Sequence, residues 1–195
     1  MKTRSSILMV TAVLCPALWA SDWPRFLGPA GNGISPEAGI NKNWAEKTPK
    51  ELWRIGMTDG GFSGPAIAGE VVYIHDHKNE QDVIRALNIN DGKELWHFAY
   101  DEPGDENHGY TRATPTVNDG KVYTVSRTGV VHCIDAATGQ KVWRADVIKD
   151  HNGKPPEWGA ANSAYIDGDR LITIAAGENA HVAALDKNNG KVRKA

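Results

Sequence analysis

One phrase recurs three times along this chain, and internal repetition constrains a fold more than any other feature of a sequence. It consists of Ala or Cys, an aliphatic residue, Asn or Asp, three variable residues, Gly and, four positions later, Trp. The copies are ALNINDGKELW at 86–96, CIDAATGQKVW at 133–143 and ALDKNNGKVRK at 184–194. A repeat of about 50 residues predicts stacked units, because one such unit cannot bury its own apolar face.

Each position of the phrase has a structural role. Asn or Asp at a strand end can accept hydrogen bonds from nearby backbone amides, and the Gly supplies the positive φ of the following turn. The Trp on the last strand offers a large apolar face with a polar N–H, which suits a contact between neighbouring units. We therefore interpret the phrase as packing, carried by Ala86, Asn88, Gly92, Trp96, Asp135, Gly139, Trp143, Asp186 and Gly190.

Short β-rich segments separated by turn residues fill each unit. In the second unit, Asn118-Asp119-Gly120 between two β-rich runs is a hairpin signal. The same spacing predicts four antiparallel strands per unit, with no room for a helix. Four-stranded sheets repeated at this period are typical of β-propeller blades. The sequence thus predicts an all-β chain and a partial propeller with about three blades, at about 62–99, 113–146 and 161–195.

The phrase resembles the tryptophan-docking motif of the quinoprotein-type, or PQQ-like, propeller repeat, Ala-x-Asp-x-x-Thr-Gly-x-x-x-Trp. The start DWPRFLGPAGNGIS, at 22–35, is similar to the mature N-terminus of exported bacterial proteins with such repeats. The resemblance covers essentially all of 22–195. It implies the propeller fold, but the family includes quinone-dependent dehydrogenases, outer-membrane assembly scaffolds and uncharacterised exported proteins.

Two features lead us to expect that the chain is the N-terminal part of a longer propeller. KELWRIG, at 50–56, repeats the Glu-Leu-Trp of the first copy but precedes the first full blade, as a strand completing the closing blade would. The third copy has Lys194 in place of the Trp, so the last blade is incomplete. We expect a frayed, exposed edge at 187–195.

The first twenty residues have the composition of a secretory signal peptide. A basic start precedes an apolar run that is too short to span a membrane, and Ala20 suits cleavage. Residues 21–49 then form an N-terminal extension, and 50–195 the propeller. Lipidation at Cys15 is the alternative, although the bulky Leu14 disfavours it. The expected location is periplasmic or secreted.

Composition excludes several classes of partner. The formal net charge is −2, and no run of Lys or Arg forms a stripe, which argues against nucleic acid or an anionic membrane. The apolar neighbours of Cys133 suggest a buried small residue rather than a reactive thiol. Without Cys15, Cys133 has no partner for an internal disulfide.

Loop lengths indicate where a site would lie. In an up-and-down blade, the connection between strands two and three and the connection between blades open on one face, which we call the long-loop face. Its expected long loops are 75–82, 100–112 and 147–161. The candidate ligand-binding residues in or beside these loops are His75, His77, His108, Tyr110, Arg112 and Trp158.

Each candidate has a plainer alternative. His75 and His77 at strand spacing would form a metal pair, but without a fixed third ligand a solvated strand end is favoured. The acidic run at 101–106 lacks the spacing of a calcium loop. Tyr110 and Arg112 precede an inner strand, facing the central channel, where a polar or anionic ligand would fit. Trp158 is favoured as packing between blades.

Two functions remain open on this evidence. The favoured one is an exported binding or scaffolding module that uses its long-loop face or channel without catalysis of its own. Its partner would be a protein, including other envelope proteins, or a small polar ligand. The alternative, which the resemblance implies, is an N-terminal fragment of a PQQ- and calcium-dependent alcohol or sugar dehydrogenase, with both cofactors held only by the full-length protein. The adjacent Cys-Cys pair of those enzymes is absent from this sequence. Glycan recognition by Tyr110 and Trp158 is a minor third possibility.

Overall fold

Three antiparallel sheets follow one another along the chain in the computed structural model, which describes residues 21–58, 60–104, 109–178 and 180–193. The first sheet contains β1 (Ala66–Ala68), β2 (Val71–Lys78), β3 (Gln81–Asn88) and β4 (Glu94–Asp101). The second contains β5 (Thr116–Asn118), β6 (Lys121–Val125), β7 (Val130–Asp135) and β8 (Lys141–Asp146). The third contains β9 (Tyr165–Asp167), β10 (Arg170–Gly177) and β11 (Ala180–Asp186).

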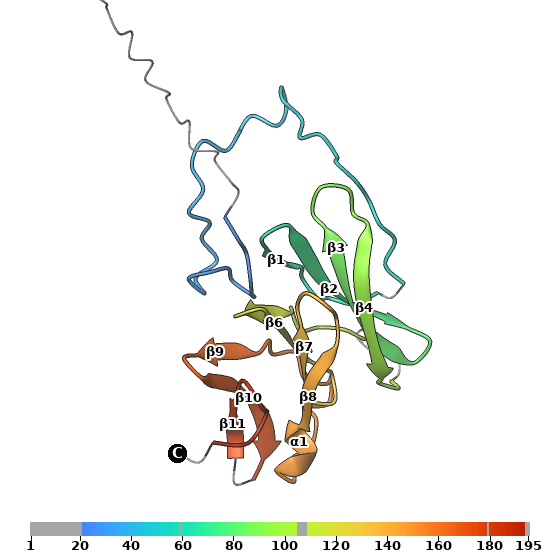
Figure 1. Ribbon diagram of the computed structural model, residues 1–195, viewed down its shortest axis with the longest axis vertical. Helices are drawn as coiled ribbons and strands as arrows, with labels where there is room; N and C mark the ends of the chain where they lie inside the picture. Colours follow the sequence, from blue (N-terminus) through green and yellow to red (C-terminus); the bar gives the residue numbers. More distant parts are fainter. Residues whose placement is uncertain (1–20, 59, 105–108, 179, 194–195) are drawn as a thin grey trace, which may run out of the picture.

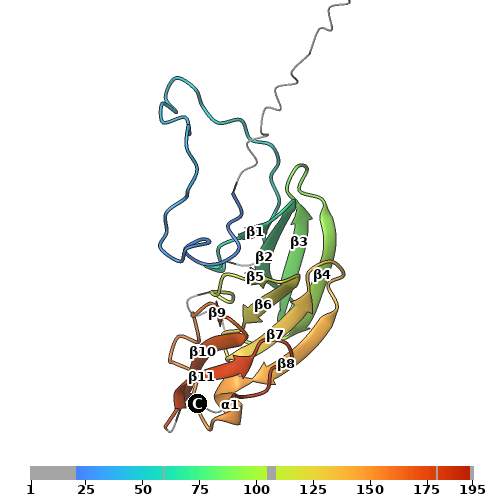
Figure 2. The ribbon, with the colours of Figure 1, turned by 60° about the vertical axis from the view of Figure 1, so that its left-hand side comes forward.

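Within each sheet the strands keep their sequence order, so every connection is a hairpin. The inner strands β1, β5 and β9 lie along one side of the molecule, and the outer strands β4 and β8 lie along the other (Figures 1 and 2). Neighbouring units are joined by hydrogen bonds at the inner strands and at the segments that lead into them, which we call their approaches. The Thr116 hydroxyl donates to the Ala164 carbonyl at 2.7 Å, and the Ser63 hydroxyl donates to the Ala113 carbonyl at 2.9 Å. This arrangement confirms the predicted partial propeller with an incomplete last blade.

The core lies between the sheets. Tyr73, Ile84 and Ala86 of the first sheet pack against Val122 and Ile134 of the second. A second cluster, between the second and third sheets, contains Tyr123, Val131, Cys133, Leu171, Ala183 and Leu185. Each sheet thus buries its apolar face only when the next sheet covers it, as the repeat predicted.

The tryptophans of the phrase join one unit to the next. Trp96 donates its indole N–H to the Ala136 carbonyl of the second unit at 3.0 Å, and its ring packs on Gly139. Trp143 repeats this contact with the third unit, donating to Lys187 at 2.9 Å. Trp53 lies outside the named strands, yet its N–H donates to Ile89 of the first unit at 2.7 Å. The three contacts are equivalent, and we call them the tryptophan staples.

Three local expectations differ from the structure, wholly or in part. The expected long loop at 75–82 is a two-residue turn, Asn79–Glu80, because β2 continues to Lys78 and β3 starts at Gln81. A short helix, α1 (Val147–Asp150), occupies part of the loop after β8. The edge at 187–193 is largely exposed, as expected, but it is not frayed, since Val192 bridges Leu185 and the Arg193 amide donates to the Ala184 carbonyl at 2.8 Å; residues 194–195 lie outside the described residues.

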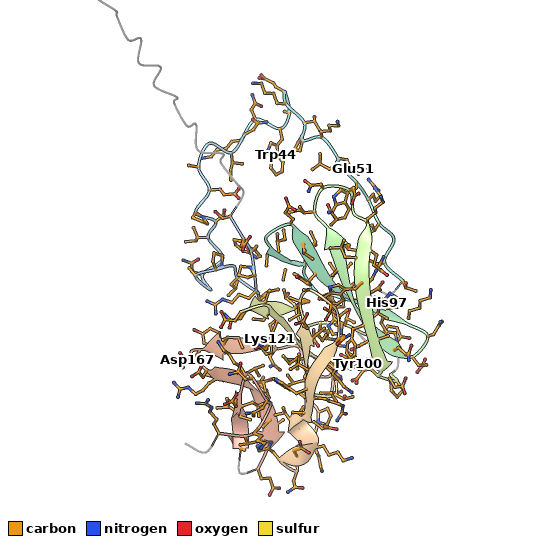
Figure 3. All side chains as sticks on the ribbon, viewed as in Figure 1. Trp44, Glu51, His97, Tyr100, Lys121 and Asp167 are labelled. Carbon is orange, nitrogen blue, oxygen red and sulfur yellow. The ribbon has the colours of Figure 1, made fainter. Side chains whose placement is uncertain are left out.

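The N-terminal extension has two parts. Residues 22–33, which we call the strap, lie against the inner strands, whereas the following residues arch away from the sheets (Figures 1 and 2). Figure 3 labels Trp44 and Glu51 on this arch, and the Trp44 side chain is 60% exposed. In the described part of the chain, no helix has the length and apolar character needed to cross a membrane.

Candidate functional site

A cluster of polar side chains is buried between the first and second sheets. His75 and His77 extend from β2 on the face that packs against the second sheet, and both are less than 5% exposed. Asp82 of β3 accepts from His75 Nε2 at 3.1 Å and from His77 Nδ1 at 2.9 Å. The Tyr100 hydroxyl of β4 donates to the same carboxylate at 3.0 Å. The Asp82 carboxylate is thus fully engaged by three buried neighbours, whereas His75 Nδ1 is buried with no hydrogen-bond partner among the described residues.

The pKa values of the cluster follow from these contacts. Burial alone would raise the pKa of Asp82, but hydrogen bonds from His75, His77 and Tyr100 hold it below its usual value. Burial and the neighbouring Asp82 charge raise the pKa of the Tyr100 hydroxyl well above its usual value. His132 of β7 closes the cluster, its ring centroid 4.1 Å from that of Tyr100. Burial, helped by the charge of Arg144, lowers the pKa of His132 to about 3.

Only some of the sequence-predicted binding residues lie at this cluster. The Tyr110 ring stacks on His77 with centroids 3.9 Å apart, so these two predicted residues come together. Arg112 lies two positions further on, and its Nη2 donates to the Gly109 carbonyl at 3.4 Å. Trp158 is 56% exposed in the loop after α1. His108 lies outside the described residues.

The acidic run has separate structural contacts where it is described. Glu102 is buried and accepts from the Thr128 amide at 3.0 Å, while Asp101 accepts from Gln81 Nε2 at 2.8 Å. Residues 105 and 106 lie outside the described part. Among the residues described, no group of three or more His, Cys, Asp or Glu side chains is placed to hold a metal ion.

The candidate site itself is a pocket of about 810 Å³ between the strap and the inner strands. One wall consists of residues at equivalent positions in successive units. Ala66, Thr116 and Tyr165 are equivalent, because each pairs with the residue seven positions later in the next strand. Four residues before each of these stand Phe62, Arg112 and Ala161, and two residues before them stand Gly64, Thr114 and Ser163. All six line the pocket. The segments that lead into the inner strands start from the long-loop face, so these six lining residues lie toward that end.

The strap forms the other wall and pairs with two inner strands. Trp23 exchanges both backbone hydrogen bonds with Ile67 of β1, each at 2.9 Å. The next residue, Pro24, accepts from the Val117 amide of β5 at 2.7 Å. The guanidinium of Arg25 then lies 5.1 Å from the ring centroid of Tyr165 in β9. Three consecutive residues thus contact three successive units.

Sequence reasoning identified Arg112 but missed the strap. The residues it missed at the pocket include Trp23, Arg25, Phe26 and Phe62. The available signal was three aromatic or cationic side chains, at 23, 25 and 26, in a segment otherwise rich in Gly and Pro. Asp82, Tyr100 and His132 were also missed as partners of the two histidines; Asp82 and Tyr100 stood at the ends of expected loops, whereas His132 lay within an expected strand.

The comparisons with known proteins agree with this architecture. The sequence family described as outer membrane protein assembly factor BamB matches residues 43–126 and 80–193. BamB of Escherichia coli strain K12 is 29% identical over 120 residues, which are 55% of this chain and 29% of that protein. The quinoprotein alcohol dehydrogenase PedH of Pseudomonas putida is 26% identical over 153 residues, which are 70% of this chain and 25% of that protein.

A solved structure shows the same fold. The quinohemoprotein alcohol dehydrogenase from Comamonas testosteroni superimposes with a TM-score of 0.68 at 20% identity, covering 89% of this chain and 26% of that chain. This chain spans less than a third of the length of the relatives named here. The family match starts at residue 43, so the strap lies outside it. Because the two matches together cover most of the sequence, the chain belongs to the PQQ-like repeat family described as outer membrane protein assembly factor BamB.

Proposed function

We propose that this chain is an exported binding or scaffolding module that takes its ligand at the pocket on the long-loop face, without catalysis of its own. The observation that carries the proposal is the convergence of equivalent positions from three units on one pocket of about 810 Å³. Ligand sites commonly have this size and are mostly apolar with a few polar groups. Loops and strand ends on a rigid scaffold are also the usual location of such sites.

The placement of the titratable groups supports a binding role. Asp82, His75 and His77 bond to one another between two sheets, and none of them lines the pocket. A general acid or base must reach the reacting atom within hydrogen-bond distance. In this chain these groups instead bond β2 to β3 within the first unit.

The names of the relatives support the scaffold and keep the alternative in view. BamB is named as an outer membrane protein assembly factor, which favours partners among envelope proteins. PedH and the Comamonas enzyme are named as alcohol dehydrogenases. The alternative function is therefore a PQQ- and calcium-dependent oxidoreductase, completed by parts of a longer protein.

The pocket residues do not fit a calcium-bound quinone. Calcium takes oxygen ligands, typically with one or more carboxylates. None of the described residues lining this pocket is Asp or Glu. We therefore assign no chemical step to PQQ or calcium in this chain.

Export is part of the proposal, since residues 1–20 lie outside the described residues and carry only the sequence signal. Expression in a Gram-negative host followed by fractionation tests it. We expect a periplasmic or secreted product whose N-terminal sequence starts at Ser21. A cytoplasmic product that retains Met1 or Lys2 would contradict export.

The face used for binding is tested by site-specific crosslinking. A photoreactive amino acid replaces Phe62, which is 73% exposed at the pocket mouth, or Asp91, in a turn on the opposite face. We expect discrete crosslinked envelope proteins from position 62 and none from position 91. Equal crosslinking from both positions would contradict a binding site on the long-loop face.

The enzymatic alternative has its own test. Purified protein is incubated with PQQ and Ca²⁺, and dye reduction is followed with alcohols and aldoses. We expect no turnover above that of heat-denatured protein. Saturable quinone binding with substrate-dependent dye reduction would replace the binding module with the oxidoreductase.

A further inference from the structure

We propose that the strap and the inner strands form a site for an aromatic ring that bears an anionic group, with an aromatic carboxylate as the simplest case. This inference rests on the proposed function and specifies its ligand. It goes beyond the region that the family model matches, because one wall of the site comes from residues 22–33, which precede that region.

Aromatic side chains supply much of the pocket's apolar surface. Trp23 and Phe26 come from the strap, Phe62 from the approach to β1 and Tyr165 from β9. Phe26, Phe62 and Tyr165 are 59%, 73% and 52% exposed. Exposed apolar groups that gather around one hollow mark an interaction site more often than scattered ones do. A flat aromatic ligand would stack on these rings and remove them from water.

The charge of the lining selects an anion. Arg25 and Arg112 both line the pocket, whereas the described lining residues include no carboxylate. The hydrogen bonds of Arg25 run to neutral acceptors, from Nε to the Gly28 carbonyl at 3.2 Å and from Nη2 to the Pro29 carbonyl at 3.0 Å. These bonds fix the guanidinium over Tyr165 while its positive charge stays available. A planar guanidinium binds a carboxylate in preference to neutral groups.

A buried acceptor atom in the lining indicates that the ligand also carries a hydrogen-bond donor. The Asn162 side chain lines the pocket, and its Nδ2 donates to the Thr173 hydroxyl at 2.8 Å. Its Oδ1 is buried, with no hydrogen-bond partner among the described residues. An N–H or O–H on the ligand would satisfy this acceptor, which is otherwise costly to bury.

Two sources share this chemistry, namely a free aromatic acid and the C-terminal residue of a protein that ends in an aromatic side chain. Titration calorimetry on the whole chain separates them with four probes. These are 2-naphthoate and its neutral counterpart 2-naphthamide, and the peptide Gly-Gly-Phe with a free carboxylate or with a C-terminal amide. We expect each acid to bind at least about tenfold more tightly than its amide, the factor for one charge-assisted hydrogen bond.

Arg25→Gln tests the residue assignment, because it removes the charge but keeps a side chain that can donate to the Gly28 carbonyl. We expect it to weaken the binding of the tighter-binding acid about tenfold and to leave the affinity for the corresponding amide unchanged. The matched control is Arg54→Gln, which removes an exposed charge outside the pocket and should change neither affinity. The affinity of Arg25→Lys for the same acid should fall between those of the wild type and Arg25→Gln. Thermal unfolding followed by circular dichroism verifies that each variant is folded.

The outcomes are distinct. Tighter binding of the peptide acid assigns the site to a protein C-terminus, and tighter binding of naphthoate assigns it to a small molecule; both support the inference. Acids and amides that bind equally, acids that do not bind at millimolar concentration, or an Arg25→Gln variant that binds normally would overturn it. Crosslinks from position 62 that persist in that case would leave the proposed function standing without this ligand class.

Discussion

At the scale of single residues, the staples show why the phrase contains both a Trp and a Gly. The Trp96 indole donates to the Ala136 carbonyl, and the Tyr73 hydroxyl lies 3.4 Å from the same oxygen. Tyr123 and Trp143 make the same pair of contacts with the Lys187 carbonyl. One backbone oxygen therefore receives two side-chain donors from the preceding unit. Such a contact is specific as well as apolar, because a slipped unit would lose both hydrogen bonds.

Gly139→Ala tests the ring contact. Gly139 has a φ of 72°, and a Cβ there would lie 2.7 Å from the Trp96 ring. Gly120 is the matched control, because its φ is 69° but nothing lies within 4 Å of its Cβ position. We expect Gly120→Ala to lower the free energy of unfolding by about 1 kcal/mol through backbone strain, and Gly139→Ala by about 1–3 kcal/mol more through overpacking. Urea denaturation measures both, and equal losses would refute the role of the staple.

The buried His132 makes a prediction about acid stability. Its pKa is lowered to about 3 in the folded protein, against about 6.5 when unfolded. The unfolded chain therefore binds more protons between these values, and stability from this group falls as the pH drops below about 6.5. His132→Phe removes this proton uptake and keeps a ring beside Tyr100. We expect a shallower decline of the free energy of unfolding between pH 6.5 and 4 than in the wild type. Parallel declines for the two proteins would show that His132 is not buried as a neutral group.

At the scale of elements, the polar run from His75 to Asp82 shows where sequence reasoning stops. Its composition predicts a loop, yet His75 and His77 share a face of β2 and Asp82 of β3 meets them there. Alternation was present in the sequence, but the alternating residues are polar and signal a solvated segment. Only the partner strand, with Tyr100 at the junction of two sheets (Figure 3), makes that face an interior one. The hairpins and staples were predictable because their residues act locally or repeat.

The turn between β2 and β3 can be improved. Asn79 and Glu80 have φ values of 53° and 62°, so both turn residues adopt the left-handed region. Asn tolerates this conformation, whereas Glu is strained by roughly 1 kcal/mol and Gly is the preferred second residue of such a hairpin. We expect Glu80→Gly to raise the free energy of unfolding by up to about 1 kcal/mol, and Asn79→Ala to lower it. Chemical denaturation measures the pair, and a destabilised Glu80→Gly would indicate that the Glu side chain has a role of its own.

At the scale of the whole molecule, the strap is the feature that no repeat could predict. It occurs once, so no second copy indicates its position, and the Arg25–Tyr165 contact joins residues far apart in the sequence. The repeat predicted the blades and their order, while the pocket depends on a segment that belongs to none of them. This difference explains why the fold was predictable and the candidate site only in part, through Arg112.

Removal of the strap tests its place in the molecule. The amides of Ile67 and Val117 donate to Trp23 and Pro24, so they are exposed to water when residues 21–33 are deleted. We expect their hydrogen exchange to accelerate by at least about tenfold, while ladder amides within β6 and β7 keep their protection. Exchange measured by NMR on both proteins provides the comparison. Unchanged exchange at both positions would mean that the strap does not pair with the inner strands in solution.

The staples also bear on how such a chain can lengthen during evolution. The second unit supplies the donor Trp143 to its staple with the third unit and the acceptor Ala136 to its staple with the first. It therefore contributes one half of each of these two joints. An in-frame duplication of that unit would place a new donor beside a new acceptor. It would add one complete joint and leave every older joint intact, since the original flanking halves still meet a compatible partner. Lengthening by whole units is therefore structurally conservative, because each donor still meets an acceptor.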